Sequence, residues 1–421
     1  ACLEICFFDF SADCYRKVQL AEKEREMKLT EETPFFFIYS VWTKNGEYRE
    51  QVKRLVTDYD NYISLKLAGD DAYLSEKMVG YPAELDEVYA ESFEEQKKEW
   101  FSCVGDGIQE CRNTWEHKKW NITDFPEFEL AITIDRPELY YDFLQKDWTR
   151  FCHDYWKNNF LEHHTLSQKR VTRIYIGNQF CHNLFPKKKL LFQVLEKALE
   201  NNLAVTLAFS YIRNHLLEEI DELLQELEVW CQSREKEAGK DQEEIIVNDW
   251  AMPILLQGKP HLKSVLGVLL NKRRKDVRLP YKHGIGNHVD SLAENNLNCG
   301  FYQDYLKNTF DIQRFEFESC GYKVTIPDGH HSLHLPFFQT NTSQYCTLYA
   351  VCRYGDREKQ KLPENCPKYC EQKVFLYPKH LKMVGRYNSL FGYDEKILWD
   401  EKQLQDYLEQ GIDRIVVNVS L

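Results

Sequence analysis

The sequence predicts an α/β protein whose C-terminal part, residues 166–421, folds as a (β/α)8-barrel-like domain. In this part, short apolar and β-branched segments alternate with amphipathic segments of helical length, which is typical of a parallel sheet covered by helices. Its length matches the ~250 residues of a usual (β/α)8 barrel. Fewer than eight clear strands can be recognised, so we expect the barrel to be irregular or incomplete.

The individual elements follow from the period of the apolar residues. Alternating or continuous β-branched runs predict strands, and apolar residues three and four apart predict helices. The expected strands are 171–177, 203–210, 244–248, 264–270, 312–318, 332–335, 374–377 and 414–419, and the expected helices are 187–202 and 215–238.

Residues 1–165 differ from the rest, because they are rich in aromatic and charged residues and show few clear strand patterns. We expect helices at 84–120 and 138–158 and a strand at 128–134. This part is therefore predicted to be a separate α+β N-terminal domain of no recognisable type.

The composition narrows the classes of function. The chain has 421 residues and a formal net charge of −13, which argues against a sequence-independent grip on nucleic acid. We find no apolar run long enough for a membrane span and no signal-peptide pattern, so we expect a cytoplasmic protein.

Four of the 14 cysteines cluster near the C-terminal end, with the spacing C-x5-C-x13-C-x3-C: Cys346, Cys352, Cys366 and Cys370. Thiolates select zinc or iron–sulfur clusters over hard cations. Structural zinc sites usually contain a tighter C-x2-C pair, whereas the longer gaps here suit a cluster. The spacing therefore favours an iron–sulfur cluster, with zinc as the alternative and a disulfide-bonded secreted protein as a third interpretation.

The order of several short segments resembles the collagenase-like peptidase family, peptidase family U-thirty-two. The segments are the run HLPFFQT at 334–340 followed by Tyr345-Cys346, the strand ends at 176–178 and 246–250, the stretch 266–272, and the run MVGRYN at 383–388. The resemblance covers roughly residues 166–421, and no single motif in it is specific.

The resemblance implies a TIM-barrel-like core with a [4Fe-4S] cluster on the four C-terminal cysteines. Several members resemble oxygen-independent hydroxylases of RNA or ubiquinone precursors rather than proteases, and some use prephenate as the oxygen donor. The gaps in this chain are slightly shorter than the family's C-x6-C-x15-C-x3-C-like pattern. Because some members take one ligand from an early strand end, Cys181 is a candidate substitute ligand.

Residues at the C-terminal ends of barrel strands line the active face. By this rule we expect the following residues at the mouth of the barrel: Asn178, Cys181, Tyr211, Asn248, Asp249, Trp250, Asn271, Lys272 and Glu318. Asp249 is the candidate general base and Asn248 a candidate for positioning substrate. The competing interpretation is that Asp249 caps the following turn. We expect His334 to be a polar group near the cysteines, and the basic run 272–275 to be a solvated loop.

The leading hypothesis is an iron–sulfur enzyme of the oxygen-independent hydroxylase kind, acting anaerobically on a small-molecule or peptide substrate. The acidic charge favours such substrates over RNA. The alternatives are a non-catalytic, heterodimeric or oligomeric partner protein with a structural cluster, a peptidase, and a zinc-stabilised binding module. The substrate itself is not specified by any motif.

Overall fold

The computed structural model describes most of the chain in two units that are compact by their internal contacts. The described residues are 2–9, 14–32, 37–53, 125–238, 242–273, 275, 277, 293–356, 359, 361–363, 365–376, 382–394 and 396–419. One unit comprises residues 1–84 and 278–289, and the other comprises 85–277 and 290–421. The expected helix at 84–120 lies outside the described residues.

The described part of the first unit consists mainly of two antiparallel strand pairs. The elements are β1 (Cys2–Asp9), β2 (Cys14–Ala21), η1 (Glu22–Glu24), β3 (Arg25–Glu32) and β4 (Phe37–Thr43), with β1 paired to β2 and β3 to β4. Val18, Leu20 and Tyr48 form a small buried cluster there. This unit has more strand than the sequence led us to expect.

The second unit is built around eight parallel strands in chain order. They are β5 (Glu129–Ile134), β6 (Arg173–Gly177), β7 (Ala204–Ala208), β8 (Glu243–Val247), β9 (Leu262–Leu266), β10 (Glu316–Glu318), β11 (His331–Leu335) and β16 (Ile412–Val417). β16 pairs with β5, and a parallel bridge between Leu266 and Phe315 connects β9 to the start of β10. The expected barrel-like α/β fold is therefore confirmed, with its last closure made by a single bridge.

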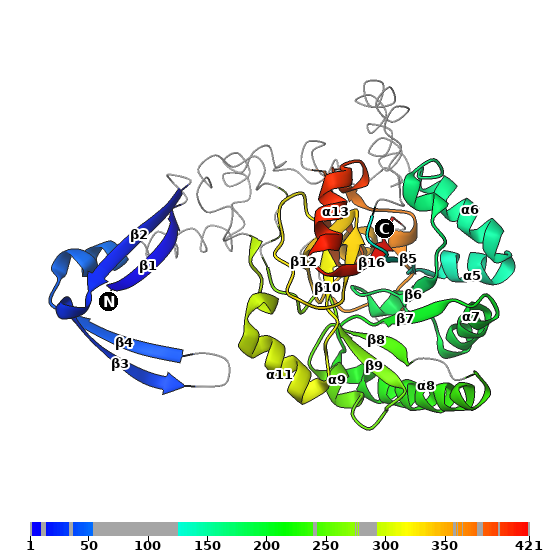
Figure 1. Ribbon diagram of the computed structural model, residues 1–421, viewed down its shortest axis with the longest axis horizontal. Helices are drawn as coiled ribbons and strands as arrows, with labels where there is room; N and C mark the ends of the chain where they lie inside the picture. The colour runs from blue at the N-terminus through cyan, green and yellow to red at the C-terminus, as the bar shows by residue number, and fades with distance from the viewer. Residues whose placement is uncertain are drawn as a thin grey trace, which may run out of the picture. The chain divides into compact units, whose positions relative to one another are not determined.

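Helices cover the outside of the strands (Figure 1). They are α5 (Pro137–Gln145), α6 (Trp148–Asn158), η4 (Thr165–Gln168), η5 (His182–Leu184), α7 (Lys188–Glu200), η6 (Asn214–Leu216), α8 (Leu217–Ala238), α9 (Ala251–Leu255), η9 (Asn296–Asn298), α11 (Gly300–Phe310), η12 (Lys396–Leu398) and α13 (Glu401–Glu409). Their apolar faces are buried, as Leu191, Val194 and Leu195 of α7 illustrate. This burial against the outer face of the sheet produces the helical period in the sequence.

The start of the barrel lies earlier than the sequence suggested. Strand β5, which we had assigned to an N-terminal domain ending at residue 165, pairs with β6 and β16 inside the eight-stranded sheet. The boundary expected between residues 165 and 166 therefore cuts through this sheet. The segment 128–134 is almost entirely apolar because a barrel strand is buried on both faces.

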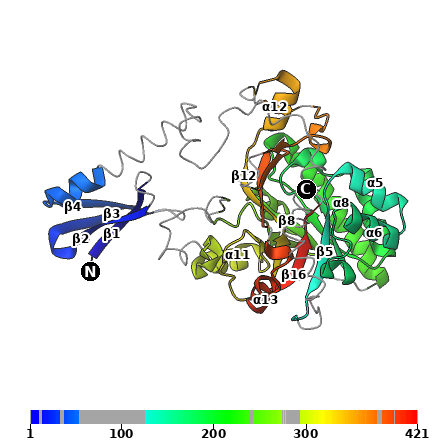
Figure 2. The same cartoon turned by 90° about the horizontal axis from the view of Figure 1, so that it is seen from above.

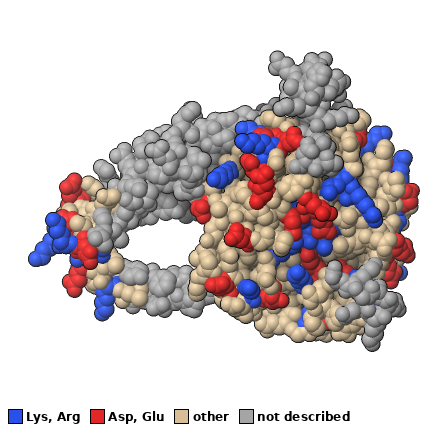
Figure 3. Space-filling model, viewed as in Figure 1, with Lys and Arg blue, Asp and Glu red and all other residues tan. Residues whose placement is uncertain are grey.

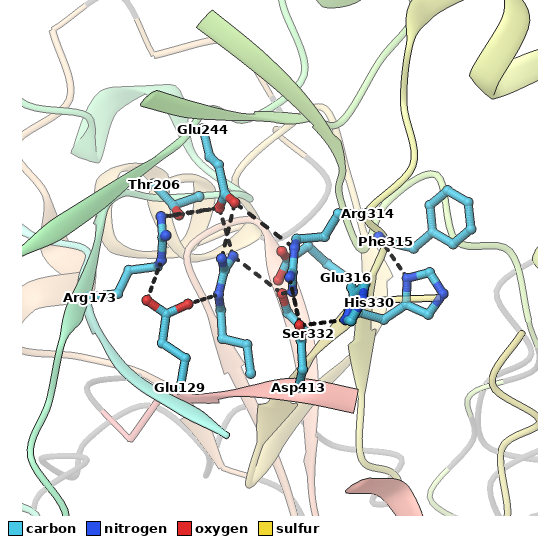
Figure 4. A network of polar contacts seen from close by, with 12 residues as sticks. Glu129, Arg173, Thr206, Glu244, Arg314, Phe315, Glu316, His330, Ser332 and Asp413 are labelled. Carbon is cyan, nitrogen blue, oxygen red and sulfur yellow. Dashed lines mark hydrogen bonds and ion pairs between the residues drawn. The ribbon is translucent and has the colours of Figure 1, made fainter. Parts of the chain in front are cut away.

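Charged side chains fill the N-terminal layer of the barrel interior (Figure 4). Arg414 binds Glu244 through two nitrogens, at 2.6 and 3.0 Å, and binds Glu129 at 2.6 Å. Arg173 also contacts both glutamates, and Arg314 binds Asp413 at 2.7 Å. This network satisfies the buried charges at the end of the barrel opposite the strands' carboxyl ends.

A large insertion between β11 and β16 carries the four clustered cysteines. It contains β12 (Phe337–Thr342), α12 (Thr347–Tyr354), η10 (Tyr369–Glu371), β13 (Phe375–Leu376), β14 (Met383–Arg386) and β15 (Ser389–Tyr393). Its strands form an antiparallel sheet in the order β12-β15-β14-β13. Strand β12 packs beside β10 and β11, and Figure 2 shows α12 farther from the barrel strands than β12. The expected strand at 374–377 exists as β13, but it belongs to this sheet.

Two further observations concern the charged side chains on the surface and the hydrophobicity of the helices. On the face shown in Figure 3, acidic and basic side chains are interspersed over the barrel unit. Among the described residues, no helix has the length and apolar character needed to cross a membrane.

Candidate functional site

Cys346 stands at the start of α12, where two polar contacts fix its sulfur. Its Sγ accepts a hydrogen bond from the backbone N–H of Tyr349 at 3.3 Å, as a helix N-cap does. The thiol also donates to the backbone carbonyl of Tyr387 at 2.9 Å. Tyr387 can offer that carbonyl because it occupies the left-handed region, with φ of 60°, in the tight turn between β14 and β15.

Cys181 follows β6, and a local turn holds it in place. The side-chain oxygen of Asn178 accepts hydrogen bonds from the backbone N–H groups of Phe180 and Cys181, both at 2.9 Å. Gly177 precedes this turn with φ of +106°, and a Cβ there would lie 2.6 Å from the carbonyl oxygen of Ala208. The chain therefore needs glycine and asparagine here to present Cys181.

Four thiols lie close enough to influence one another electrostatically. Burial raises the pKa of Cys181 to about 11 and that of Cys346 to about 12, with a contribution from the neighbouring Cys366 in both cases. Burial likewise raises the pKa of Cys370 well above its ordinary value, and Cys181, Cys346 and Cys366 add to that shift. We call these four residues the cysteine group.

Two arginines stand beside the cysteine group. Arg386 is buried, donates to the backbone carbonyl of Cys370 at 2.9 Å and opposes the rise of that cysteine's pKa. Arg213 acts in the same sense on the pKa of Cys181. Both cations oppose the effect of burial, but the pKa of each cysteine stays raised, so the thiols keep their protons at neutral pH until a metal displaces them.

Cys352, one of the four expected ligands, stands apart from this group. The pKa of its thiol is raised by burial and influenced by Lys373, with no cysteine among the causes. It lies six residues after Cys346 along α12, and on a helix with 3.6 residues per turn such residues point to different sides. Cys181, the candidate substitute ligand, therefore influences the pKa of Cys346 and Cys370, whereas Cys352 does not figure in those shifts.

Asn248 and Asp249 follow β8, as expected, but their side chains are already engaged. The oxygen Oδ1 of Asp249 accepts hydrogen bonds from the backbone of Ala251 and Met252, both at 3.0 Å, and Oδ2 accepts one from Ile212. This is the capping arrangement that the sequence offered as the competing interpretation of Asp249, and its role as a general base stays a prediction.

The Asn248 side chain joins three strand ends. It donates to the carbonyl of Phe209 at 2.7 Å and to Gln179 at 3.3 Å, and accepts from the backbone N–H of Leu269 at 3.1 Å. These contacts hold the ends of three strands together, and substrate positioning by Asn248 stays a prediction.

The other expected residues at the mouth have mixed roles. Asn178 and Glu318 are buried and line a cavity, whereas Trp250 and Lys272 are exposed. Asn271 donates to the backbone carbonyl of Glu316. Tyr211 donates to the carbonyl of Ser343, which connects β7 to the insertion.

The basic run 272–275 turns partly inward, contrary to the solvated loop that we expected. Lys275 forms an ion pair with Glu318, and Arg273 donates to the backbone carbonyl of Glu318 at 2.9 Å. Burial lowers the pKa of Lys275 despite that carboxylate. The run therefore neutralises a buried acid at the mouth of the barrel.

The sequence pointed to neither Asp135 nor Asn418, which also line the cavity at the mouth. Each directly follows a strand, β5 or β16 respectively. The strand-end rule would have found Asp135 if the segment 128–134 had been counted as a barrel strand.

The described residues thus define a nearly closed, barrel-like α/β domain with a cysteine-bearing insertion at the C-terminal ends of its strands. Comparison of the chain with protein-family models, curated proteins and solved structures found no significant match.

Proposed function

We propose that the protein is an iron–sulfur enzyme whose [4Fe-4S] cluster is held by the cysteine group, with its substrate in the mouth of the barrel. The observation that carries the proposal is that four thiols from separate segments influence one another electrostatically, on the side of the barrel where the strands end. Cys181 takes the place of Cys352 in this ligand set.

The donor set suits a cluster. Four thiolates with nearby arginines match the thiolate ligation and the negative charge of such a centre. Among the described residues, no three His, Cys, Asp or Glu side chains approach closely enough to hold a single metal ion. In a cubane cluster each cysteine binds a different iron, so the sulfurs need not meet at one point. Zinc remains the alternative metal.

Tyr387 connects the cysteine group to the cavity. Its backbone carbonyl accepts from Cys346, and its hydroxyl donates to Asp135 at 3.3 Å. A bound cluster would supply redox or Lewis-acid chemistry next to the cavity, and the protein residues would bind and orient the substrate there.

The resemblance to the collagenase-like peptidase family supports oxygen-independent hydroxylation of a small-molecule or peptide substrate as the reaction. All nine cysteines whose side chains the structure describes are free thiols, which supports a reducing, cytoplasmic setting. We therefore include that setting in the proposal.

One observation favours the alternative of a partner protein with a structural cluster. Trp250 and Phe301 are 40% and 74% exposed on neighbouring elements, and the rings of Trp250 and Tyr305 lie 6.3 Å apart. Exposed aromatic groups of this kind are common at protein interfaces. A second subunit that bound these aromatic side chains would support the heterodimeric interpretation.

The test is the metal content of the protein after anaerobic purification. Iron and acid-labile sulfide near four of each per chain, with a brown colour that air bleaches, would support the proposal. A colourless protein with one zinc per chain would contradict it. Substrate turnover by the cluster-loaded protein, lost on chelation of iron, would then separate the enzyme from the structural alternative.

A further inference from the structure

A small cavity lies in the mouth of the barrel, among side chains that point inward from the strands. Its volume is about 40 Å³, which holds a few water-sized groups at ~10–15 Å³ each. Gly177 and Ala208 contribute to its wall and leave the space that larger side chains would fill. A cavity of this size receives one functional group of a substrate rather than a whole molecule.

His334 lines this cavity and is held by a buried carboxylate. Its Nε2 lies 2.5 Å from Oε2 of Glu316, whose side chain is fully buried. The ring of Tyr175 packs edge-on against His334, and the Tyr175 hydroxyl donates to Glu316 at 3.1 Å. These contacts fix the orientation of the imidazole.

The charge of Glu316 decides which nitrogen of His334 carries the hydrogen. Burial tends to raise the pKa of Glu316, but hydrogen bonding from His334 and the nearby Arg414 outweigh it, so the pKa lies below its ordinary value. An ionised carboxylate only accepts hydrogen bonds, so Nε2 is the donor. In neutral His334 the other nitrogen, Nδ1, then has a free lone pair, and among the described residues it has no hydrogen-bond partner.

Asp135 supplies a second acceptor on the same cavity. It is 8% exposed, and its Oδ1 atom is buried without a hydrogen-bond partner among the described residues. Its other oxygen accepts from the hydroxyl of Tyr387. A buried carboxylate oxygen without a partner is costly, and a ligand that donates a hydrogen bond would remove that cost.

The remaining lining residues determine which chemical groups fit. The lining includes the acids Asp135 and Glu318 and the acceptor-bearing Gln179, but no Lys or Arg among the described residues. Glu318 is already neutralised by Lys275. A carboxylate or phosphate would therefore meet negative charge, whereas a hydroxyl or amino group would find acceptors.

We propose that this cavity binds the hydroxyl or amino group of the substrate between Asp135 and His334, with Oδ1 of Asp135 and Nδ1 of His334 as the acceptors of its hydrogen bonds. Glu316 is the positioning residue that fixes the orientation of the imidazole. The inference rests on the proposed function, because it places the substrate at that same site.

Binding of small probes tests the inference without knowledge of the substrate. Ethanolamine and ethylene glycol carry the predicted groups, and acetate is a carboxylate of similar size without a hydroxyl or amino group. Saturation-transfer NMR should show saturable millimolar binding of ethanolamine and no saturable binding of acetate. Asp135→Asn should weaken ethanolamine binding at least tenfold, and the surface control Glu226→Gln, whose ion pair with Lys188 is exposed, should not change it.

A second measurement does not depend on whether the variants fold. In wild-type protein labelled with ¹⁵N-histidine, the His334 resonances should show hydrogen on Nε2, and ethanolamine should shift mainly the Nδ1 signal. Equal binding of acetate, an effect of Asp135→Asn no larger than that of Glu226→Gln, or hydrogen on Nδ1 would overturn the inference.

The same titrations, repeated with iron-loaded and iron-free protein, separate this inference from the proposed function. If the protein cannot hold iron but binds ethanolamine in a way that depends on Asp135, the proposed cluster is contradicted and the cavity assignment is supported. An iron-loaded protein that binds acetate as well as ethanolamine would contradict the cavity assignment and leave the cluster supported.

Discussion

Replacing Arg414 with Met should destabilise the barrel strongly, because it leaves buried carboxylates without their main partner. Arg414 is 3% exposed, and it contacts Glu244 and Glu129, which are 7% and 26% exposed. Removing one partner of a buried ion pair costs roughly 3–5 kcal/mol. Arg173 and Arg314 remain near Glu244, so we expect the lower end of that range.

The pKa of Glu244 gives an independent estimate of this loss. Burial tends to raise that pKa, but Arg414 and Arg173 hold it at about 2, below the ordinary 4.5. At ~1.4 kcal/mol per pKa unit, the shift corresponds to roughly 3 kcal/mol of stability. A lowered folded-state pKa stabilises above pH 4.5, and this contribution is lost as the pH falls toward 2.

Urea unfolding followed by circular dichroism from pH 7 downward measures both effects. Arg414→Met should lose roughly 3 kcal/mol at pH 7, and the difference from wild type should shrink below about pH 4.5. Lys188→Met removes an ion pair whose partners are 61% and 43% exposed, so it should cost under ~1 kcal/mol. A loss for Arg414→Met as small as that of the control, or one that is independent of pH, would refute the reasoning.

Three further predictions concern the mouth of the barrel and the thiols. Gly177→Ala should lower the thermal midpoint of unfolding, because the positive φ of Gly177 and the contact of a Cβ with Ala208 cost at least ~1–3 kcal/mol. The control Gly300→Ala has open space around its Cβ, so its thermal midpoint should hardly change. Asp249→Ala should cost about 1 kcal/mol as a lost cap and leave ethanolamine binding unchanged; lost binding would restore its expected role at the site. In iron-free protein at pH 8, iodoacetamide should label the exposed Cys299 much faster than Cys346, because burial raises the pKa of Cys346 to about 12. Mass spectrometry measures the two labelling rates, and equal rates would argue against the burial of Cys346.

The barrel itself could be predicted from the sequence, because each buried strand is a short apolar run between helical segments. Its first strand was placed in the wrong domain for a physical reason. The segment 128–134 follows a long aromatic-rich region, and its partners β6 and β16 lie far away in the chain, so local patterns do not reveal the pairing. The closure between Leu266 and Phe315 is a single bridge, which leaves no sequence signal.

The site was predictable in part. The spacing of the C-terminal cysteines predicts a metal-binding segment, but it does not say which thiols would bind the metal. Along the sequence, more than half of the barrel separates Cys181 from the other three cysteines, so only the fold lets Cys181 influence Cys346. Asp249 shows the limit of the strand-end rule, since a carboxylate placed just before a helix caps that helix.

The iron content of two single variants tests the central claim most directly. Cys181→Ser and Cys352→Ser should be purified anaerobically beside the wild-type protein, with iron and sulfide measured in each. We predict near four irons per chain in the wild type and in Cys352→Ser, and a clear loss in Cys181→Ser. Full iron in Cys181→Ser together with loss in Cys352→Ser, or no iron in the wild type, would contradict the cysteine group proposed for this barrel.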